Sequence, residues 1–346
     1  MIEIDGSTGE GGGQLVRTAC ALSALTGTAI RLFSIRARRA PPGLAPQHLT
    51  AVRAVAALCG AEVEGLEVRA SEIRFRPQAL RGGEYRFDVG TAGSITLVLQ
   101  AVLPVAFACP QPVRLIVCGG TDVRAAPPLD YLRFVFLPLL ERIGLSASLT
   151  LHTRGYYPRG GGEVTVDVRP GSPRCLVLDE AGKLEAIGGV AHVANLPVHI
   201  VERMQDTAEQ LLRPLLPAVH IKPEALGPDR AIGAGGAIAL WARTSTTLLG
   251  GGAVAQRGIP AERIARDAAE PLLADLRVGA TLDLHAVDQL LIYLARAPGE
   301  SRFQVRALTT HAETCLWLLR QFLPLEVNVH AEAELTSISL RAPRGD

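Results

Sequence analysis

Hydrophobic and polar residues along the chain form a cycle of strand-like and helix-like patterns that begins again after roughly 80–90 residues. In the first cycle, residues 1–5 alternate like a strand, a glycine-rich loop follows, and the small apolar residues of 14–25 predict a helix. A strand near 30–35, a helix near 47–58 and two strands before Pro77 complete it. The pattern predicts a strand-helix-strand-helix-strand-strand unit.

The same unit recurs twice, the last time incompletely. The second cycle starts at a strand, and its elements are expected at 85–88, 95–106, 113–118 and 129–143, with strands to about 180. The third starts at a helix, and its elements are expected at 288–297, 303–305, 312–323, 326–330 and 335–340. Such a repeat predicts a pseudo-threefold arrangement with helices inside and sheets outside.

The segment 184–278 interrupts this period. It carries strand patterns at 186–194, 237–242 and 246–249 and helix patterns at 201–215 and 260–276. We therefore expect an α+β fold. Its large repeat domain is formed by residues 1–183 and 279–346, and its smaller inserted α/β domain by residues 184–278.

Composition narrows the class of protein. A hydrophobic content of 48% and a charged content of 20% describe a packed chain with little room for disorder. The six cysteines form no C-x-x-C pair, which argues against a structural zinc site, and a net charge of +1 argues against broad binding to long nucleic acid. With no membrane-length apolar run and no leader-like start, we expect a cytoplasmic protein without a membrane partner.

Positive charge is carried almost entirely by arginine. The only lysines are Lys183 and Lys222, neither lies in a K-x-D-G setting, and the chain contains no G-x-x-x-x-G-K-[ST]. A lysyl-nucleotide intermediate and a P-loop are therefore not expected. Covalent chemistry would need another nucleophile.

Glycine-rich loops mark three candidate phosphate sites. Those at 9–14 and 90–94 lie between a strand and a helix, where free backbone N–H groups suit phosphate. Glu10, in the first loop, is either a solvated turn residue or an oxygen ligand for Mg²⁺ on a nucleotide. The run R-G-Y-Y-P-R-G-G-G-E-V at 154–164 is either a tight hairpin or an anion-binding loop.

Arginines and one histidine complete the candidate chemistry. Arg36, Arg38 and Arg39 precede a Pro-Pro-Gly turn, where they form either a solvated loop or a site for a terminal phosphate that Arg17 can also reach. His311 follows two threonines at a predicted helix start. The helix dipole there would keep the imidazole neutral and nucleophilic, although on spacing alone a surface role is the simpler interpretation.

Motifs over nearly the whole chain resemble those of the RNA 3′-terminal phosphate cyclases. They are D-G-S-T-G-E-G-G-G-Q (5–14), S-I-R-A-R-R-A-P-P-G-L-x-x-Q-H-L (34–49), G-x-A-G-S-x-T-L-V-L-Q (90–100), G-G-T-D-x-x-x-A-P-P-x-D-Y (119–131), the 154–164 run, A-N-L-P-x-H-I-V-E-R-M (194–204) and D-Q-L-L (288–291). The resemblance implies a three-repeat domain like that of enolpyruvate transferases, with a small inserted domain.

The resemblance also implies a ligase that forms phosphoric ester bonds, with ATP and Mg²⁺ or Mn²⁺ as cofactors. A histidine would take AMP from ATP, pass it to an RNA 3′-phosphate, and the vicinal 2′-OH would close a 2′,3′-cyclic phosphate and release AMP. The partners are thus ATP and an RNA 3′-phosphate end. The oligomeric state stays open, with a homodimer as one possibility.

Site residues are carried over position by position. The family's histidine begins the helix that ends in Phe-Leu-Pro, which here is His311 before Phe322-Leu323-Pro324. Glu10 matches the metal-contacting carboxylate. The residues near the phosphates are Arg17, Arg39 and Gln47, and those of the nucleotide pocket are Gln100, Pro127, Asp288 and Gln289.

Two positions depart from the family pattern. His285 replaces the tyrosine that stacks on adenine, and Cys315 replaces an asparagine after Thr314. With the chemistry expected at Glu10 and His311, the 154–164 run becomes a structural turn between two repeats. Two alternatives remain. A non-catalytic ribosome-assembly member would lack the histidine, and an enolpyruvate transferase would need lysines that the chain lacks.

Overall fold

The first unit forms one sheet in the computed structural model, which describes residues 1–215 and 218–342. The sheet order is β1-β2-β4-β3, with β1 parallel to β2 and the other pairs antiparallel. Its elements in chain order are β1 (Ile2–Asp5), α1 (Gly13–Thr26), β2 (Ile30–Phe33), α2 (Pro46–Cys59), β3 (Glu62–Glu64) and β4 (Ile73–Arg76). The predicted unit is confirmed.

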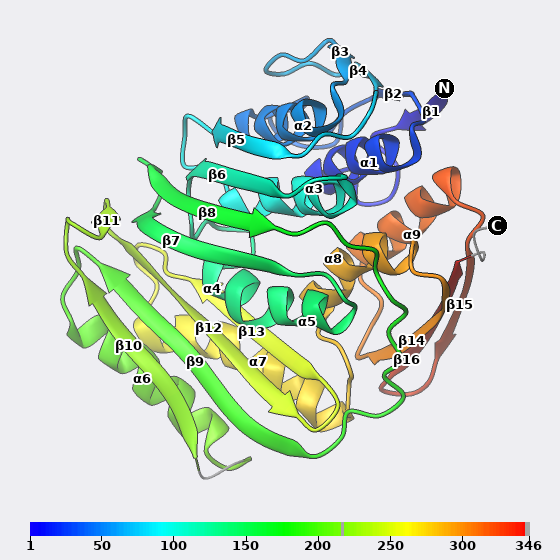
Figure 1. Cartoon of the computed structure of the whole chain (residues 1–346). Helices are drawn as coiled ribbons and strands as arrows, with labels where there is room; N and C mark the ends of the chain where they lie inside the picture. The colour runs from blue at the N-terminus through cyan, green and yellow to red at the C-terminus, as the bar shows by residue number, and fades with distance from the viewer. Residues whose placement is uncertain (216–217, 343–346) are drawn as a thin grey trace.

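The second unit repeats this topology (Figure 1). Its sheet has the order β5-β6-β8-β7, which is again first, second, fourth, third, with the first pair parallel. A π-helical turn lies within the helix predicted at 129–143. The elements are β5 (Gly83–Asp88), α3 (Ile95–Ala108), β6 (Val113–Gly119), α4 (Leu129–Tyr131), η1 (Leu132–Phe136), α5 (Leu137–Arg142), β7 (Ala147–Gly155) and β8 (Gly162–Val168).

The third unit obtains its missing first strand from a distant segment. Its own strands have the order β14-β16-β15, which matches second, fourth, third. Residues 176–178 run parallel to β14, where the Leu178 N–H donates to the Arg302 carbonyl and the Arg302 N–H to the Leu176 carbonyl. The unit thus begins near residue 176. Its other elements are α8 (Leu284–Leu294), β14 (Gly299–Val305), α9 (Thr310–Phe322), β15 (Glu326–Ala331) and β16 (Thr336–Ala342).

The interrupting segment builds a sheet of different topology. Its order is β10-β9-β12-β13, so the strand that comes first in the chain is central, and α6 and α7 pack against the sheet. β10 was not predicted as a strand, although its apolar and polar residues alternate; only Ile221 of its side chains is buried, and Pro223 interrupts the strand pattern. The elements are β9 (Leu184–Ala194), α6 (His199–Leu212), β10 (Val219–Leu226), β11 (Ala231–Ile232), β12 (Gly235–Thr244), β13 (Leu248–Val254) and α7 (Ala261–Val278).

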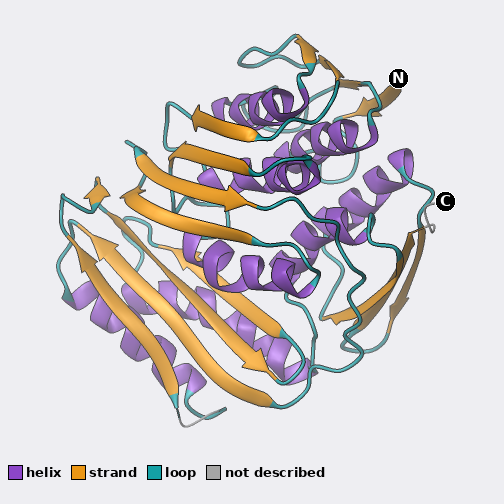
Figure 2. Cartoon of the chain, in the orientation of Figure 1, coloured by secondary structure: helices purple, strands orange, loops and turns teal. Residues whose placement is uncertain are grey.

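Helices of the three units form the interior. α1 packs on α2, α3 and α9, and α8 packs on α9, with the sheets of the units on the outer side (Figure 2). The buried apolar residues of these units form one cluster, which also includes Ala239 and Leu248 of the inserted segment, whereas most buried apolar residues of that segment form a second cluster. On that basis we propose residues 184–278 as a separate domain and residues 1–183 and 279–346 as the large domain. Residues 343–346 of the large domain lie outside the described part of the chain.

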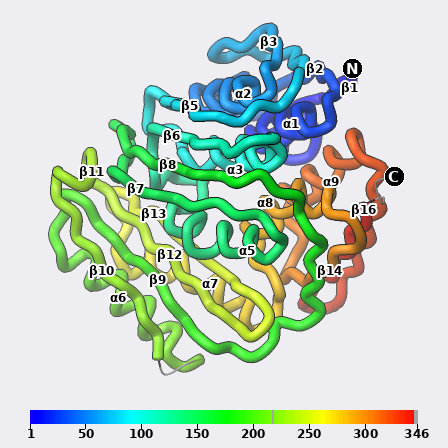
Figure 3. Tube along the Cα trace, viewed as in Figure 1, coloured from blue at the N-terminus to red at the C-terminus, as the bar shows by residue number. Residues whose placement is uncertain are grey.

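The path of the chain places the inserted segment between two parts of the third unit. Figure 3 traces it through the first and second units, out into β9–α7, and back to α8. The interruption follows the first strand of the third unit and precedes its first helix, α8. Within the described residues, no helix is both long and apolar enough to cross a bilayer.

Candidate active site

A cavity of about 630 Å³ lies where the helix N-termini of the units meet the inserted segment. It is lined by the start of α1, the N-termini of α8 and α9, the loop 124–128, and parts of β13 and α7. Seven residues predicted as site residues line it: Arg17, Gln100, Pro127, His285, Asp288, Gln289 and His311. They come from all three units, so only the tertiary fold brings them together.

The other three predicted residues lie outside the lining. Glu10 forms an ion pair with Arg39, and its Oε2 is 3.6 Å from Nδ1 of His311, so this pair adjoins the cavity. Gln47 is directed elsewhere, because its Oε1 accepts a hydrogen bond from the Ser94 N–H at 3.3 Å. That bond holds the second glycine loop, and residues 90–94 do not line the cavity.

His311 is held at the start of α9 in one orientation. Thr309 caps the helix by accepting the Ala312 N–H at 2.9 Å, as the sequence predicted. Nδ1 of His311 lies 2.7 Å from Oε1 of Gln14. Because an amide oxygen only accepts, Nδ1 carries the proton and Nε2 keeps its lone pair. Burial, together with Arg17 and Arg39, lowers the pKa of His311, which favours the neutral ring.

Arg17 is a buried cation at the cavity wall. Only 8% of it is exposed, and burial lowers its pKa to about 10, so it stays charged at neutral pH. It forms no hydrogen bond or ion pair with the residues of 1–215 and 218–342. A buried charge is costly unless it is paired, so this guanidinium is a ready partner for an anion in the cavity.

His48 is structural. It is buried, its Nδ1 accepts the Ala45 N–H at 3.0 Å at the start of α2, and burial beside Arg17 and Arg36 lowers its pKa to about 3. The neutral ring packs against Gly13, where an added Cβ would collide with its Nε2. His48 therefore shapes the first glycine loop without adding charge to it.

Three carboxyl groups whose pKa values are raised by burial also line the cavity. Asp288 accepts the Thr309 hydroxyl at 2.5 Å, and Asp283 accepts the Tyr131 hydroxyl at 2.7 Å. Burial raises the pKa of both, and it raises that of Asp275 to about 6 despite a 2.9 Å ion pair with Arg306. The cavity lining thus combines a buried cation, Arg17, with carboxyl groups of raised pKa.

The first glycine loop is fastened to α9. Gly9 has φ +58°, and a Cβ there would collide with the Thr314 side chain. The Glu10 N–H donates to Oγ1 of Thr314 at 3.1 Å. Sequence reasoning assigned no role to Thr314 or Gln14, although Gln14 closes the first motif, which was a signal that this side chain has a function.

The 154–164 run is a structural turn, but it joins different parts than predicted. Arg154 is buried and paired with Asp122 and Asp130, and the hydroxyl of Tyr156 is 3.0 Å from Nδ1 of His192 on β9. β11 also pairs with β7 beside it. The turn therefore connects the second unit to the inserted segment, not two repeats to each other.

The fold is built from three repeated units, and its cavity contains an oriented neutral histidine and a buried arginine that has no partner among residues 1–215 and 218–342. Such a cavity is typical of proteins that bind anionic ligands. The family model described as RNA 3′-terminal phosphate cyclase matches residues 8–329. The chain belongs to the RNA 3′-terminal phosphate cyclase family.

Its relatives match over their full length. The RNA 3′-terminal phosphate cyclase of Nitrosospira multiformis is 56% identical, with 98% of this chain and 96% of that protein covered. The proteins of the same name from Ignicoccus hospitalis (96% and 96% covered) and Methanopyrus kandleri (100% and 99%) are 47% and 45% identical. The solved enolpyruvyl transferase NikO from Streptomyces tendae matches 98% of this chain and 48% of its own, at 10% identity and a TM-score of 0.38, too low to bear on the fold.

Proposed function

We propose that this protein uses ATP to convert an RNA 3′-terminal phosphate into a 2′,3′-cyclic phosphodiester, with His311 as the carrier of AMP. The observation that carries the proposal is the free Nε2 of a neutral His311 in the same cavity as the unpaired, buried Arg17. A nucleophile and a phosphate partner in one cavity are what nucleotidyl transfer requires. Family membership supports the same reaction.

The reaction would proceed in three balanced steps. Nε2 of His311 attacks the α-phosphorus of ATP, a P–N bond forms, and pyrophosphate leaves. An oxygen of the RNA 3′-phosphate then attacks that phosphorus, the P–N bond breaks, and an RNA-adenylate anhydride results. Finally the 2′-OH attacks the RNA phosphorus, loses its proton, and AMP leaves.

The residues of the chain fall into three proposed roles. Gln14 holds the proton of His311 on Nδ1, so that Nε2 is available in the first step. Arg17 and Arg39 would neutralise phosphate charge, while Gln47 would act only indirectly by holding the second glycine loop through Ser94. The nucleotide would lie against Gln100, Pro127, His285, Asp288 and Gln289, with the imidazole of His285 as the stacking surface.

A divalent cation at this site would take its ligands from the phosphates of the substrate as well as from the protein. No group of three or more His, Cys, Asp or Glu side chains suited to a metal occurs in the described ranges. Mg²⁺ is commonly held by one or two carboxylates together with substrate phosphates. Glu10 fits that role if Arg39 turns from it to the phosphates. Mg²⁺ or Mn²⁺ there would offset phosphate charge.

Labelling with α-³²P-ATP tests the proposal. We expect the wild-type protein, with Mg²⁺ or Mn²⁺ and no RNA, to acquire an acid-labile, alkali-stable label, and His311→Ala to acquire none. His330→Ala is the matched control, because His330 is exposed on β15 and far from the cavity lining. Equal labelling of wild type and His311→Ala would refute the assignment.

A second assay tests the overall reaction. A 3′-phosphorylated oligoribonucleotide should become resistant to phosphatase only when ATP is present, and should not do so with His311→Ala. A protein that binds this RNA but never makes it resistant would be the non-catalytic member of the family instead.

A further inference from the structure

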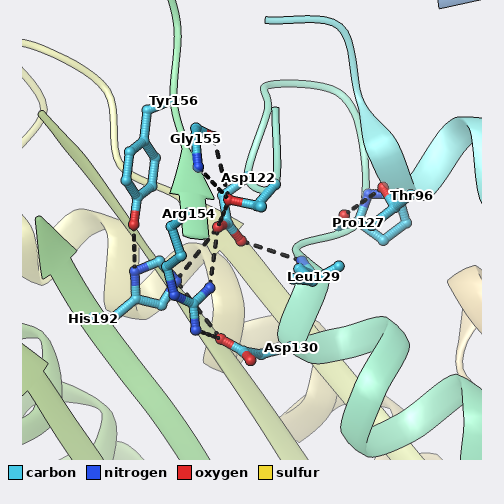
Figure 4. Close-up of polar contacts among 10 residues, drawn as sticks. Thr96, Asp122, Pro127, Leu129, Asp130, Arg154, Gly155, Tyr156 and His192 are labelled. Carbon is cyan, nitrogen blue, oxygen red and sulfur yellow. Dashed lines mark hydrogen bonds and ion pairs between the residues drawn. The ribbon is translucent and has the colours of Figure 1, made fainter. Parts of the chain in front are cut away.

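Two buried aspartates bracket the loop that forms one wall of the cavity. Asp122 and Asp130 are each 2% exposed, and residues 124–128 between them line the cavity. Figure 4 shows the side chain of Arg154 between the two carboxylates. Its Nη1 is 3.2 Å from Oδ2 of Asp122, and its Nη2 is 2.6 Å from Oδ2 of Asp130. One guanidinium therefore joins both ends of the wall.

Further hydrogen bonds fix the shape of this loop. Oδ1 of Asp122 accepts the Leu129 N–H at 3.2 Å, and its Oδ2 accepts the Thr121 hydroxyl at 2.8 Å. The carbonyl of Pro127 accepts the hydroxyl of Thr96, on α3, at 3.0 Å (Figure 4). The conformation of the wall thus depends on Asp122, and the position of Asp122 depends on Arg154.

The inserted segment completes the cluster through His192, on β9. Its Nε2 lies 3.6 Å from Oδ2 of both aspartates. Its other ring nitrogen, Nδ1, lies 3.0 Å from the hydroxyl of Tyr156. Although burial opposes ionisation, His192 and Arg154 hold the pKa of Asp122 below its usual range.

We infer that Arg154 is a positioning residue for the nucleotide: it clamps both ends of the cavity wall 124–128, and His192 ties that clamp to the inserted segment. The inference rests on the proposed function, because it assumes that the cavity binds ATP. A planar guanidinium can bridge two carboxylates at fixed geometry, whereas an ammonium group cannot hold both in the same way. With 3% of its side chain exposed, Arg154 is not a contact for RNA.

Replacement of Arg154 tests the clamp. In Arg154→Lys, we expect the dissociation constant of a non-hydrolysable ATP analogue, measured by calorimetry, to rise about tenfold, as for the loss of one charge-assisted hydrogen bond. The maximal rate of His311 labelling at saturating ATP and the KM for RNA should stay unchanged. Arg159→Lys is the matched control, since Arg159 is exposed in the same hairpin and makes no ion pair in the described part of the chain.

Hydrogen exchange gives a readout that does not depend on activity. Amides of residues 121–132 should exchange faster in Arg154→Lys than in wild type, and those of α1 should not change. Tyr156→Phe removes only the oxygen that orients His192, and we expect a weakening of analogue binding of about threefold. This milder variant tests the clamp even if Arg154→Lys fails to fold.

The outcomes separate the two proposals. Folded variants with wild-type analogue affinity and wild-type exchange at 121–132 would overturn the clamp. A fall in the maximal labelling rate without a change in affinity would also overturn it, because the wall would then not position the nucleotide. If the wild-type protein itself neither binds the analogue nor becomes labelled, the proposed function fails instead.

Discussion

Single side chains around His311 are arranged so that each determines the state of its neighbour. Gln14 selects the tautomer of His311. Thr309 caps α9 and also donates its hydroxyl to Asp288. Glu10, which pairs with Arg39, lies 3.6 Å from Nδ1 of His311. Their positions leave Nε2 of His311 free, as its proposed role as the nucleophile requires.

Loss of the Gln14 acceptor should slow the first step. In Gln14→Met, Nδ1 of His311 loses its partner, both tautomers become populated, and the ring is free to turn. We expect the rate of labelling by α-³²P-ATP to fall about 10- to 100-fold with unchanged thermal stability. Gln321→Met, at the exposed far end of α9, is the control, and an unaffected rate in Gln14→Met would remove Gln14 from the mechanism.

The labelling rate should also report the pKa of His311. Burial first, and then Arg17 and Arg39, lower this pKa below its ordinary value of 6.5. The neutral, nucleophilic form therefore persists to lower pH than in a free histidine, so the acid limb of the rate profile should have its midpoint below 6.5. Arg39→Gln removes one of the cations and should move the midpoint upward. A midpoint above 6.5 in wild type would contradict this assignment.

Secondary-structure elements place these side chains through their ends. The first glycine loop packs on α9 only because Gly9 presents no Cβ to Thr314 and takes φ +58°. α8 begins at Asp283, whose carboxylate caps the helix and binds Tyr131 of α4 and the Gly250 N–H of β13. The helix starts are thus tied to neighbouring elements, which brings their first residues to the cavity.

Gly9→Ala should destabilise this loop. The new methyl group meets Thr314 and the backbone is held at positive φ, each of which is unfavourable for alanine. We expect a loss of about 2 kcal/mol in the free energy of unfolding, measured in urea. Gly258→Ala is the matched control: Gly258 has φ +83° but open space around its Cβ position, so its smaller loss measures the backbone cost alone. Equal losses would mean that the contact with Thr314 is unimportant.

At the scale of the whole molecule, several contacts attach the inserted segment to the units. Arg306 of the third unit pairs with Asp275 of α7, and the carboxylate of Asp283 accepts the N–H of Gly250 on β13. The cluster around Arg154 attaches it to the second unit. The residues of the first two contacts line the cavity, so the packing of the segment and the shape of the cavity are linked.

The pair of Asp275 and Arg306 predicts a pH dependence of stability. Burial raises the pKa of Asp275 to about 6, above its value in the unfolded chain, so the folded state binds the proton more tightly. Its contribution to stability is therefore present below about pH 4 and is lost as pH rises through about 6. We expect this group to lower the free energy of unfolding by about 2 kcal/mol between these values.

Asp275→Asn provides the measurement. Urea unfolding at pH 4.5 and pH 7 should show a smaller difference for this variant than for wild type, because asparagine does not titrate. Asp267→Asn, on the same helix but exposed to solvent, should keep the wild-type difference. An identical difference in wild type and Asp275→Asn would show that the carboxyl of Asp275 does not titrate in this range.

The sequence by itself determined the repeat, the interruption at 184–278 and the candidate residues, because periodicity and glycine-rich motifs are local properties of the chain. It also placed His311 at a capped helix start. It did not reveal β10, whose alternating pattern is interrupted by Pro223, or the first strand of the third unit, which is supplied from residues 176–178.

Tertiary structure alone decided which candidates meet. It brought Arg17, Gln100, His285 and His311 to one cavity and turned Gln47 toward Ser94, because contacts between residues far apart in the chain depend on how the three units close around their helices. It also buried Arg154 between two aspartates. In the sequence, Arg154 belongs to a motif that suggests an anion site. In the folded chain its guanidinium is paired with the carboxylates of Asp122 and Asp130.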